Sequence, residues 1–212
     1  MVFKPLLIST IVTVRDIILT NIKGIHMTNL NSNIFNGNRV KLSIPREEDV
    51  ETMLKWEEDT EYLRNVDTDI ALPKSKEQLI SEGKPASNEV YFRLRTIDQE
   101  QLIGFVTIHS IEWNNRAGTL SIGIGDSSNR NKGYGSDALQ LILRYAFHEL
   151  NLDRVGLEVI EYNKGGIRAY EKVGFQQEGR KRSAVYRDGK RYDVIVMGIL
   201  HNDWKAIQGS VE

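Results

Sequence analysis

The sequence of 212 residues has the length of one globular domain with room for a terminal extension. With 40% hydrophobic and 27% charged residues and a formal net charge of -1, it lacks the overall charge that draws a protein to nucleic acids or membranes, and we expect neither as a partner. The absence of cysteine excludes disulfides, thiolate metal sites and a cysteine nucleophile, and it fits the reducing cytoplasm, where we expect the protein.

An apolar run at residues 5–14 lies near the start of the chain and is interrupted by Arg15 and Asp16. It is shorter than the roughly 20 apolar residues that a membrane-spanning helix needs. Its length matches a signal-peptide core, but no small-x-small cleavage pattern follows closely. We interpret the run as an extra strand or helix, or as part of an upstream extension of a protein that starts at Met27. The chain is accordingly divided into an N-terminal extension, one folded domain and a tail, at residues 1–38, 39–206 and 207–212.

The domain begins with alternating apolar and polar residues, which predict a strand at residues 39–44 that Pro45 ends. A helix follows at residues 47–58, with acidic residues in its first turn. Its apolar positions are Val50, Met53, Leu54 and Trp56. We interpret residues 59–74 as a polar connection and residues 75–81 as a short helix.

A three-stranded antiparallel meander comes next, at residues 90–97, 102–108 and 119–125. A polar loop at residues 126–132 then leads into an amphipathic helix at residues 136–150, whose polar face includes Asp137. The remaining elements are a strand, a helix and a closing hairpin, at residues 155–160, 163–173, 175–185 and 192–200. Asp188 and Gly189 are typical of the tip of such a hairpin.

This order predicts an α+β fold with a mixed central sheet of about seven strands. The helix at residues 136–150 joins two parallel strands, which makes one β-α-β unit inside an otherwise antiparallel arrangement. Such units bind ligands at the carboxyl ends of their strands. Residues 126–135 lie at that position and form the first candidate site.

The candidate loop contains the run Arg130-Asn131-Lys132-Gly133-Tyr134-Gly135, followed by Ser136. Gly133 and Gly135 allow the backbone to approach a ligand closely with its N–H groups turned outward. The N-terminus of the following helix adds partial positive charge, so the loop suits an anion without any special side chain. Arg130 and Lys132 add further charge. A pyrophosphate fits this loop, and the alternative is a glycine turn whose basic residues are solvated.

Two other phosphate motifs compete for the loop. It lacks the pattern G-x-x-x-x-G-K-[ST], which disfavours a P-loop NTPase. Residues 133–138 match the dinucleotide fingerprint G-x-G-x-x-A, and Glu158 lies near the acidic position about 20 residues further on. A dinucleotide fold, however, repeats its β-α-β unit and places its glycines directly after the strand. The preceding meander and the intervening residues 126–132 therefore argue against a dinucleotide enzyme, which stays as an alternative.

The loop resembles the acyl-CoA motif R/Q-x-x-G-x-G/A of the GNAT superfamily of N-acetyltransferases, whose fixed positions are Arg130, Gly133 and Gly135. Residues 163–175, with A-Y-E-K-V-G-F after Asn163, are similar to a second signature of the family. Residues 186–193 with Met197 resemble the branch that contains ribosomal-protein N-terminal acetyltransferases and spermidine acetyltransferases. The resemblance covers residues 39–204.

The resemblance implies an N-acetyltransferase that transfers the acetyl group of acetyl-CoA to a primary amine by direct attack. It implies that the pantetheine arm pairs with the backbone of Ile122 and Ile124. It places the pyrophosphate on the N–H groups of Arg130, Asn131, Lys132, Gly133, Tyr134, Gly135 and Ser136. Asn163 is expected near the pantetheine or the thioester. Tyr170 is the expected general acid for the departing thiolate, because a phenol with a pKa near 10 can protonate it. The alternative is that Tyr170 is a core aromatic.

One departure from the family leaves the general base open. Many members carry on the fourth strand a glutamate that draws the proton from the amine, and here Gly118 or Thr119 occupies that place. Neither side chain serves as a base. Glu112, Glu158 and Glu161 are the possible substitutes, and ordered water or an amine that is already neutral are the other routes.

The acceptor is indicated only by charge. Residues 57–69 carry six acidic residues and one opposing charge, Arg64. In the family fold this connection borders the acceptor site, where an acidic rim attracts a cationic amine such as a polyamine, an aminoglycoside-like base or a protein N-terminus. The alternative is a solvated acidic helix end. Likewise, the basic run 180–182 faces either the 3′-phosphate of CoA or water.

Other function classes find less support. His26, His109, His148 and His201 lack metal-ligand spacing, so we expect no metal. A non-catalytic acyl-CoA sensor of the same fold stays as the alternative to an enzyme, because the usual base is missing. We expect a monomer or a homodimer.

Overall fold

The computed structural model describes residues 33–82, 84 and 86–209. The interpretations of residues 1–32, including a start at Met27, and the end of the predicted tail therefore lie outside the described residues. Within the described part of the chain, no helix is both long enough and apolar enough to cross a membrane.

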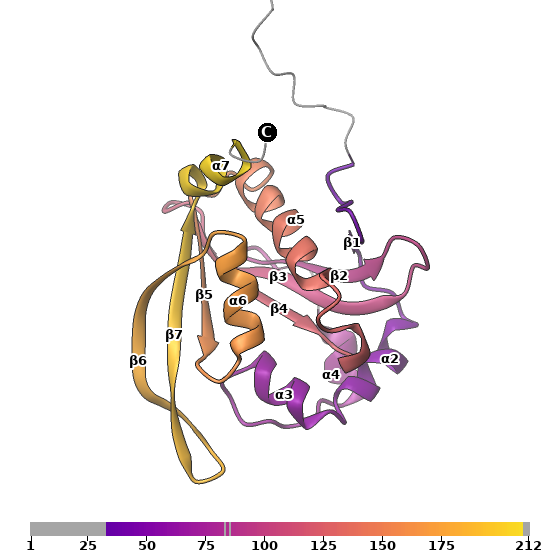
Figure 1. The fold of residues 1–212 in the computed structure, drawn as a ribbon. Helices are drawn as coiled ribbons and strands as arrows, with labels where there is room; N and C mark the ends of the chain where they lie inside the picture. The colour runs from indigo at the N-terminus through magenta and orange to yellow at the C-terminus, as the bar shows by residue number, and fades with distance from the viewer. Residues whose placement is uncertain (1–32, 83, 85, 210–212) are drawn as a thin grey trace, which may run out of the picture. The chain divides into compact units, whose positions relative to one another are not determined.

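Seven strands form one mixed sheet in the order β1-β2-β3-β4-β5-β7-β6 (Figure 1). The strands are β1 (Val40–Ser43), β2 (Val90–Thr96), β3 (Leu102–Glu112), β4 (Ala117–Ile124), β5 (Arg154–Ile160), β6 (Gln176–Arg187) and β7 (Lys190–Leu200). Only β4 and β5 pair in parallel, and the other neighbours are antiparallel. The predicted α+β fold with its single β-α-β unit is confirmed. At the tip of the last hairpin, Asp188 and Gly189 both have positive φ, as a tight two-residue turn requires.

Helices cover both faces of the sheet. They are α2 (Asp49–Trp56), α3 (Thr60–Val66), α4 (Lys76–Ser81), α5 (Tyr134–His148), α6 (Lys164–Lys172) and α7 (His201–Gly209), with a single 3-10 turn at Ser127–Asn129. One core lies under α5, α6 and α7, and a second lies under α2, α3 and α4. The apolar positions predicted for the first helix all pack in the second core.

The helix α3 contradicts the prediction of a polar connection at residues 59–74. Asp59 caps it by accepting hydrogen bonds from the backbone N–H groups of Glu61 and Tyr62, at 2.9 and 3.1 Å. Tyr62 and Leu63 are its buried residues. Its apolar residues Tyr62, Leu63 and Val66 have helical spacing, but the helix is only seven residues long and is surrounded by acidic residues, so the sequence did not indicate it.

Asp137 is a second correction, because it is buried rather than part of a solvated polar face. Its carboxylate accepts hydrogen bonds from the backbone N–H groups of Asn38, Arg39 and Val40, at 3.0, 2.7 and 2.9 Å. These bonds fasten the start of β1 to the first turn of α5, where negative charge also favours the helix dipole. They hold α5 in place over the sheet.

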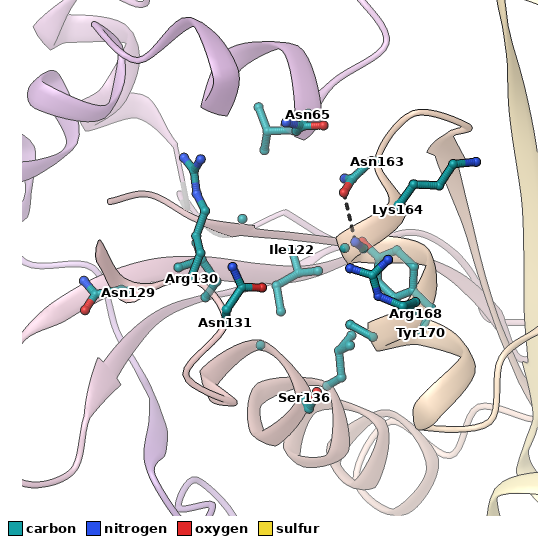
Figure 2. A pocket seen from close by; sticks show the side chains of 18 of the residues that line it. Asn65, Ile122, Asn129, Arg130, Asn131, Ser136, Asn163, Lys164, Arg168 and Tyr170 are labelled. Atoms are coloured by element: carbon teal, nitrogen blue, oxygen red, sulfur yellow. Dashed lines mark hydrogen bonds between the residues drawn. The ribbon is translucent and has the colours of Figure 1, made fainter. Parts of the chain in front are cut away.

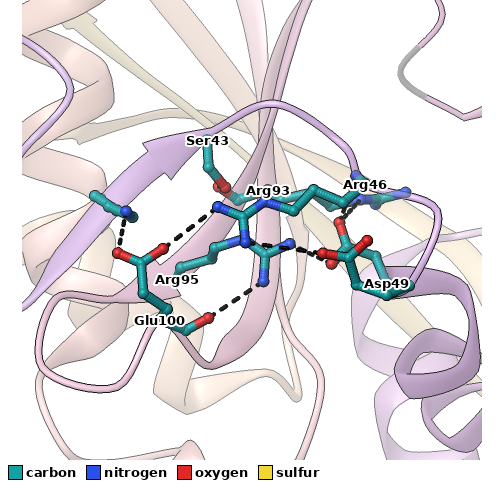
Figure 3. Close-up of polar contacts among 8 residues, drawn as sticks. Ser43, Arg46, Asp49, Arg93, Arg95 and Glu100 are labelled. Atoms are coloured by element: carbon teal, nitrogen blue, oxygen red, sulfur yellow. Dashed lines mark hydrogen bonds and ion pairs between the residues drawn. The ribbon is translucent and has the colours of Figure 1, made fainter.

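A charged cluster is buried between α2 and β2 (Figure 3). Alternate residues of β2 pack under α5, so Arg93 and Arg95 point to the opposite face, where they are 1% and 4% exposed. Asp49, at 2% exposure, pairs with Arg95 and lies 4.0 Å from Nε of Arg93. It also accepts a hydrogen bond of 2.8 Å from the backbone N–H of Arg46. From the first turn of α2, Asp49 therefore offsets part of the positive charge of the two arginines, and Glu82 lies 3.8 Å from Arg93.

Candidate active site

The two parallel strands separate soon after they meet, and the space between them is the start of the candidate site. The strands β4 and β5 are paired only from Ala117–Arg154 to Thr119–Gly156. Beyond Thr119, β4 runs on to Ile124 without a strand on that side among the described residues. A cleft of about 640 Å³ opens there, lined by β4, α3, the loop before α5, the N-terminal part of α5, and one side of α6 (Figure 2).

Most of the predicted site residues meet in this cleft. Its lining includes Ile122, Ile124, Arg130, Asn131, Gly133, Gly135, Ser136, Asn163 and Tyr170. The side chains of Lys132 and Tyr134 are not part of it. Tyr134 packs against the core under α5, and the backbone carbonyl of Lys132 accepts a hydrogen bond of 2.6 Å from the guanidinium of Arg39.

The glycines of the loop differ in their structural task. Gly133 has a φ of 84°, a left-handed conformation that only glycine adopts without strain, and it is the N-cap of α5. Gly135 lies inside the first turn, and a methyl group added there meets no atom within 4 Å. The space beside Gly135 belongs to the cleft, so the backbone is open to a ligand at this point.

Arg130 departs most from its predicted role. Its Nη2 donates to Oδ2 of Asp59 and to the carbonyl of Gly125, both at 2.9 Å, and its Nη1 lies 3.3 Å from a carboxylate oxygen of Glu61. The guanidinium therefore links the loop to the N-terminus of α3, and two carboxylates balance its charge. An anion at this loop would therefore depend on the backbone N–H groups rather than on this side chain.

Tyr170 lies on α6 at the wall of the cleft and is 9% exposed. Its ring makes an edge contact with Phe175. One part of the side chain therefore packs in the core, and another part lines the cleft. Burial raises the pKa of the hydroxyl to about 12. Within the described residues the hydroxyl has no hydrogen-bond partner. Asn163 accepts a hydrogen bond of 2.9 Å from the N–H of Gly166 and so caps the same helix.

The predicted substitutes for the base all lie outside the cleft lining. Glu112 bonds to Asn115, Glu158 pairs with Lys181, and Glu161 accepts from Arg180 and the N–H of Asp193. These pairings satisfy each carboxylate elsewhere on the surface. Of the described residues that line the cleft, Glu61 is the only acidic one.

The acidic residues of the connection at residues 57–69 have different roles in the structure. Glu57 is buried and accepts a hydrogen bond of 2.8 Å from the N–H of Lys74, and Asp59 caps α3. Glu58 is exposed and borders a separate cavity beside α2 and α3. Only Glu61 combines exposure with a place at the cleft. The predicted acidic rim is thus reduced to one carboxylate.

The tip of the last hairpin braces the end of α3 and the residues that follow it. Arg64 makes two hydrogen bonds to Asp188, of 2.7 and 2.9 Å, and Arg187 donates to the carbonyls of Thr68 and Asp69. The hydroxyl of Tyr162, which lines the cleft, donates to the carbonyl of Arg64 at 2.6 Å. These contacts between the hairpin tip, α3 and Tyr162 could not be predicted, because no local sequence pattern links the residues.

A row of basic residues on α6 was also missed. Lys164, Arg168 and Lys172 line the cleft, and their spacing of four residues was visible in the sequence.

Comparison with protein families gives a match over residues 39–176 to a model described as "Acetyltransferase (GNAT) domain". Among curated proteins, the chain is similar to Probable N-acetyltransferase YjcK of Bacillus subtilis, with 36% identity over 54% of this chain and 64% of that relative. It is also similar to SPbeta prophage-derived uncharacterized N-acetyltransferase YokL of the same organism, with 26% identity over 71% of this chain and 85% of YokL. The match with YjcK thus spans less than two thirds of that protein.

Among solved structures, the fold is similar to spermidine N-acetyltransferase from Vibrio cholerae, solved in complex with CoA and spermine. The TM-score is 0.70, at 23% sequence identity, and the match covers 78% of this chain and 98% of the other.

Proposed function

The chain belongs to the GNAT acetyltransferase family, and from this premise we propose that it transfers the acetyl group of acetyl-CoA directly to a primary amine. The observation that carries the proposal is the unpaired edge of β4, which ends beside a glycine-rich turn at the N-terminus of α5. An extended amide chain pairs with such an edge, and a pyrophosphate suits such a turn. The pantetheine and the pyrophosphate of CoA offer these two features next to each other.

The reacting groups follow from this placement. The backbone of Ile122 and Ile124 holds the pantetheine, and the N–H groups from Arg130 to Ser136 hold the pyrophosphate. Tyr170 then faces the departing sulfur with a free, protonated hydroxyl. The amine attacks the thioester carbonyl after losing its proton to water or in its neutral form, because no glutamate replaces the missing base on β4.

The proposed acceptor is a cationic amine, either a polyamine, another small basic amine or a protein N-terminus. Glu61 supports this choice, since its carboxylate lines the cleft at the end of α3 and is 71% exposed. The fold similarity to an enzyme solved with spermine is consistent with it. We propose the cytoplasm as the compartment, because the sequence holds no cysteine.

Two measurements test the proposal. Calorimetry should detect binding of acetyl-CoA, and an assay of released thiol should detect turnover with at least one member of an amine panel. No binding at millimolar acetyl-CoA would refute the donor. Binding without thiol release across the panel would favour the sensor alternative instead.

Replacing Gly135 with leucine should weaken acetyl-CoA binding by about tenfold or more without lowering the melting temperature. The motif allows alanine at this position, so a larger side chain is needed to fill the space beside the loop. A Cβ atom added here meets no protein atom within 4 Å, and leucine favours a helix more than glycine does. Calorimetry and thermal melting measure the two effects. Gly209→Leu is the control, because that glycine is equally open at the end of α7. Undiminished affinity in Gly135→Leu would place the phosphates elsewhere.

Replacing Glu61 with glutamine should raise the KM for a cationic acceptor by about three- to fivefold, as expected for one exposed charge. The effect should shrink at high salt, since screening weakens such attraction. Steady-state kinetics with varied amine measure it, and Glu58→Gln serves as a neighbouring control outside the cleft. A strong fall in kcat at unchanged KM would contradict this role and make Glu61 the base.

A further inference from the structure

Three cations form a row along the cleft side of α6. Lys164, Arg168 and Lys172 follow one another at intervals of four residues, which places them on one face of the helix. All three line the cleft. In the described part of the chain, none of their side chains makes an ion pair or a hydrogen bond. The row therefore offers positive charge that no carboxylate of the described residues neutralises.

Several other basic side chains near the site are already paired. Arg130 is held by Asp59 and Glu61. In the basic run 180–182, Arg180 pairs with Glu161 and Asp193, and Lys181 pairs with Glu158. The sequence offers that run as a partner for the 3′-phosphate of CoA, but its first two charges are paired with carboxylates. Among the described basic side chains that line the cleft, the unpaired ones are therefore those on α6.

The donor carries one phosphate more than the loop accommodates. The N–H groups of the turn and the N-terminus of α5 suit the two phosphates of the pyrophosphate. CoA also bears a dianionic phosphate on the ribose, and that group needs cationic side chains. The row on α6 extends over about 12 Å, from the rise of a helix across eight residues. That length is sufficient to receive a phosphate beyond the pyrophosphate.

We propose that Arg168, flanked by Lys164 and Lys172, binds the ribose 3′-phosphate and makes the protein select acetyl-CoA over its 3′-dephospho form. This inference rests on the proposed function, because it assumes CoA in the cleft. Figure 2 shows Arg168 on the part of α6 that borders the cleft, while Lys164 points away from the loop. Arg168 is therefore the main residue of the proposed phosphate site, since a guanidinium binds phosphate through two parallel hydrogen bonds.

The test compares the affinity of CoA with that of 3′-dephospho-CoA by calorimetry. The natural protein should bind CoA at least about tenfold more tightly, and this ratio should fall at high salt. In Arg168→Ala the ratio should drop by about five- to tenfold, because CoA binds more weakly while 3′-dephospho-CoA binds as before. The unchanged affinity for 3′-dephospho-CoA also verifies that the variant is folded. Lys164→Ala with Lys172→Ala should lower the ratio further.

Lys181→Ala is the matched control, since it removes one exposed positive charge outside the cleft. It should keep the ratio of the natural protein. An equal loss of both ligands in Arg168→Ala would assign Arg168 to the pyrophosphate and overturn the inference. The same holds if the natural protein binds both forms equally. If it bound neither form, the proposed donor itself would be wrong, which is a different outcome from a lost preference.

Discussion

Replacing Tyr170 with phenylalanine is expected to lower kcat by about 100-fold or more while leaving the affinity for acetyl-CoA nearly unchanged. General acid catalysis is commonly worth about 10²–10⁴ in rate. The substitution removes only the hydroxyl and keeps the ring that packs against Phe175. Since the hydroxyl has no partner among the described residues, no internal hydrogen bond is lost with it. Single-turnover kinetics with a saturating amine would measure the chemical step directly.

The pH dependence gives a second view of the same residue. The active form of Tyr170 is protonated, and burial raises its pKa to about 12, so its contribution is lost only as the pH rises toward that value. The alkaline side of the kcat profile should therefore stay level up to about pH 10. Tyr145→Phe is the control, because that ring lies away from the cleft, against Phe35 and Phe92. Equal kcat values for Tyr170→Phe and the control would remove Tyr170 from the mechanism.

Replacing Asp49 with alanine should destabilise the fold by about 3–5 kcal/mol, because it leaves a buried charge uncompensated. Asp49 lies within 4.0 Å of both Arg93 and Arg95, and Nε of each arginine already lacks a hydrogen-bond partner. The nearest other carboxylate, Glu82, lies 3.8 Å from Arg93 and is partly exposed. For a domain of this size the loss corresponds to a melting temperature lower by about 10 °C.

Thermal and urea unfolding measure this change, and Glu51→Ala is the control within the same helix. Glu51 pairs with Lys76 on the surface, where solvent screens the interaction, so the control should melt close to the natural protein. Asp49→Asn should lie between the two, since it retains a hydrogen-bond acceptor but loses the charge. A melting temperature for Asp49→Ala that equals the control would mean that water reaches the two arginines.

The donor half of the site could be predicted from the sequence because its signals are local. Gly133 and Gly135 lie at the junction of a strand and a helix, and Asn163 and Tyr170 belong to one short helix. Such features depend on neighbouring residues, so their spacing in the sequence resembles their spacing in space. These residues are few and close in the sequence, so a family signature includes them.

The acceptor half could not be predicted, because long-range contacts build it. Arg130 meets Asp59 across 71 residues, and Arg64 meets Asp188 across 124. The buried charged cluster between α2 and β2 could not be predicted for a similar reason. Alternation in β2 indicates one buried face, but only the packing of α2 buries the face that carries Arg93 and Arg95. The helix α7 follows β7 without a breaker and with few apolar residues, so no boundary marked it.

The brace between the hairpin tip and α3 has a consequence for how such a protein diverges. Its bonds are made at the rim by the half-buried Arg64 and Arg187 and the exposed Asp188, whereas the loop proposed to bind the donor lies between β4 and α5. Under the proposed function, exchanging rim residues is expected to shift α3 and to alter which amine is accepted, while the loop and the core are left intact. The proposed donor loop and the rim thus belong to separate parts of the domain, so substrate preference could change at little cost to folding.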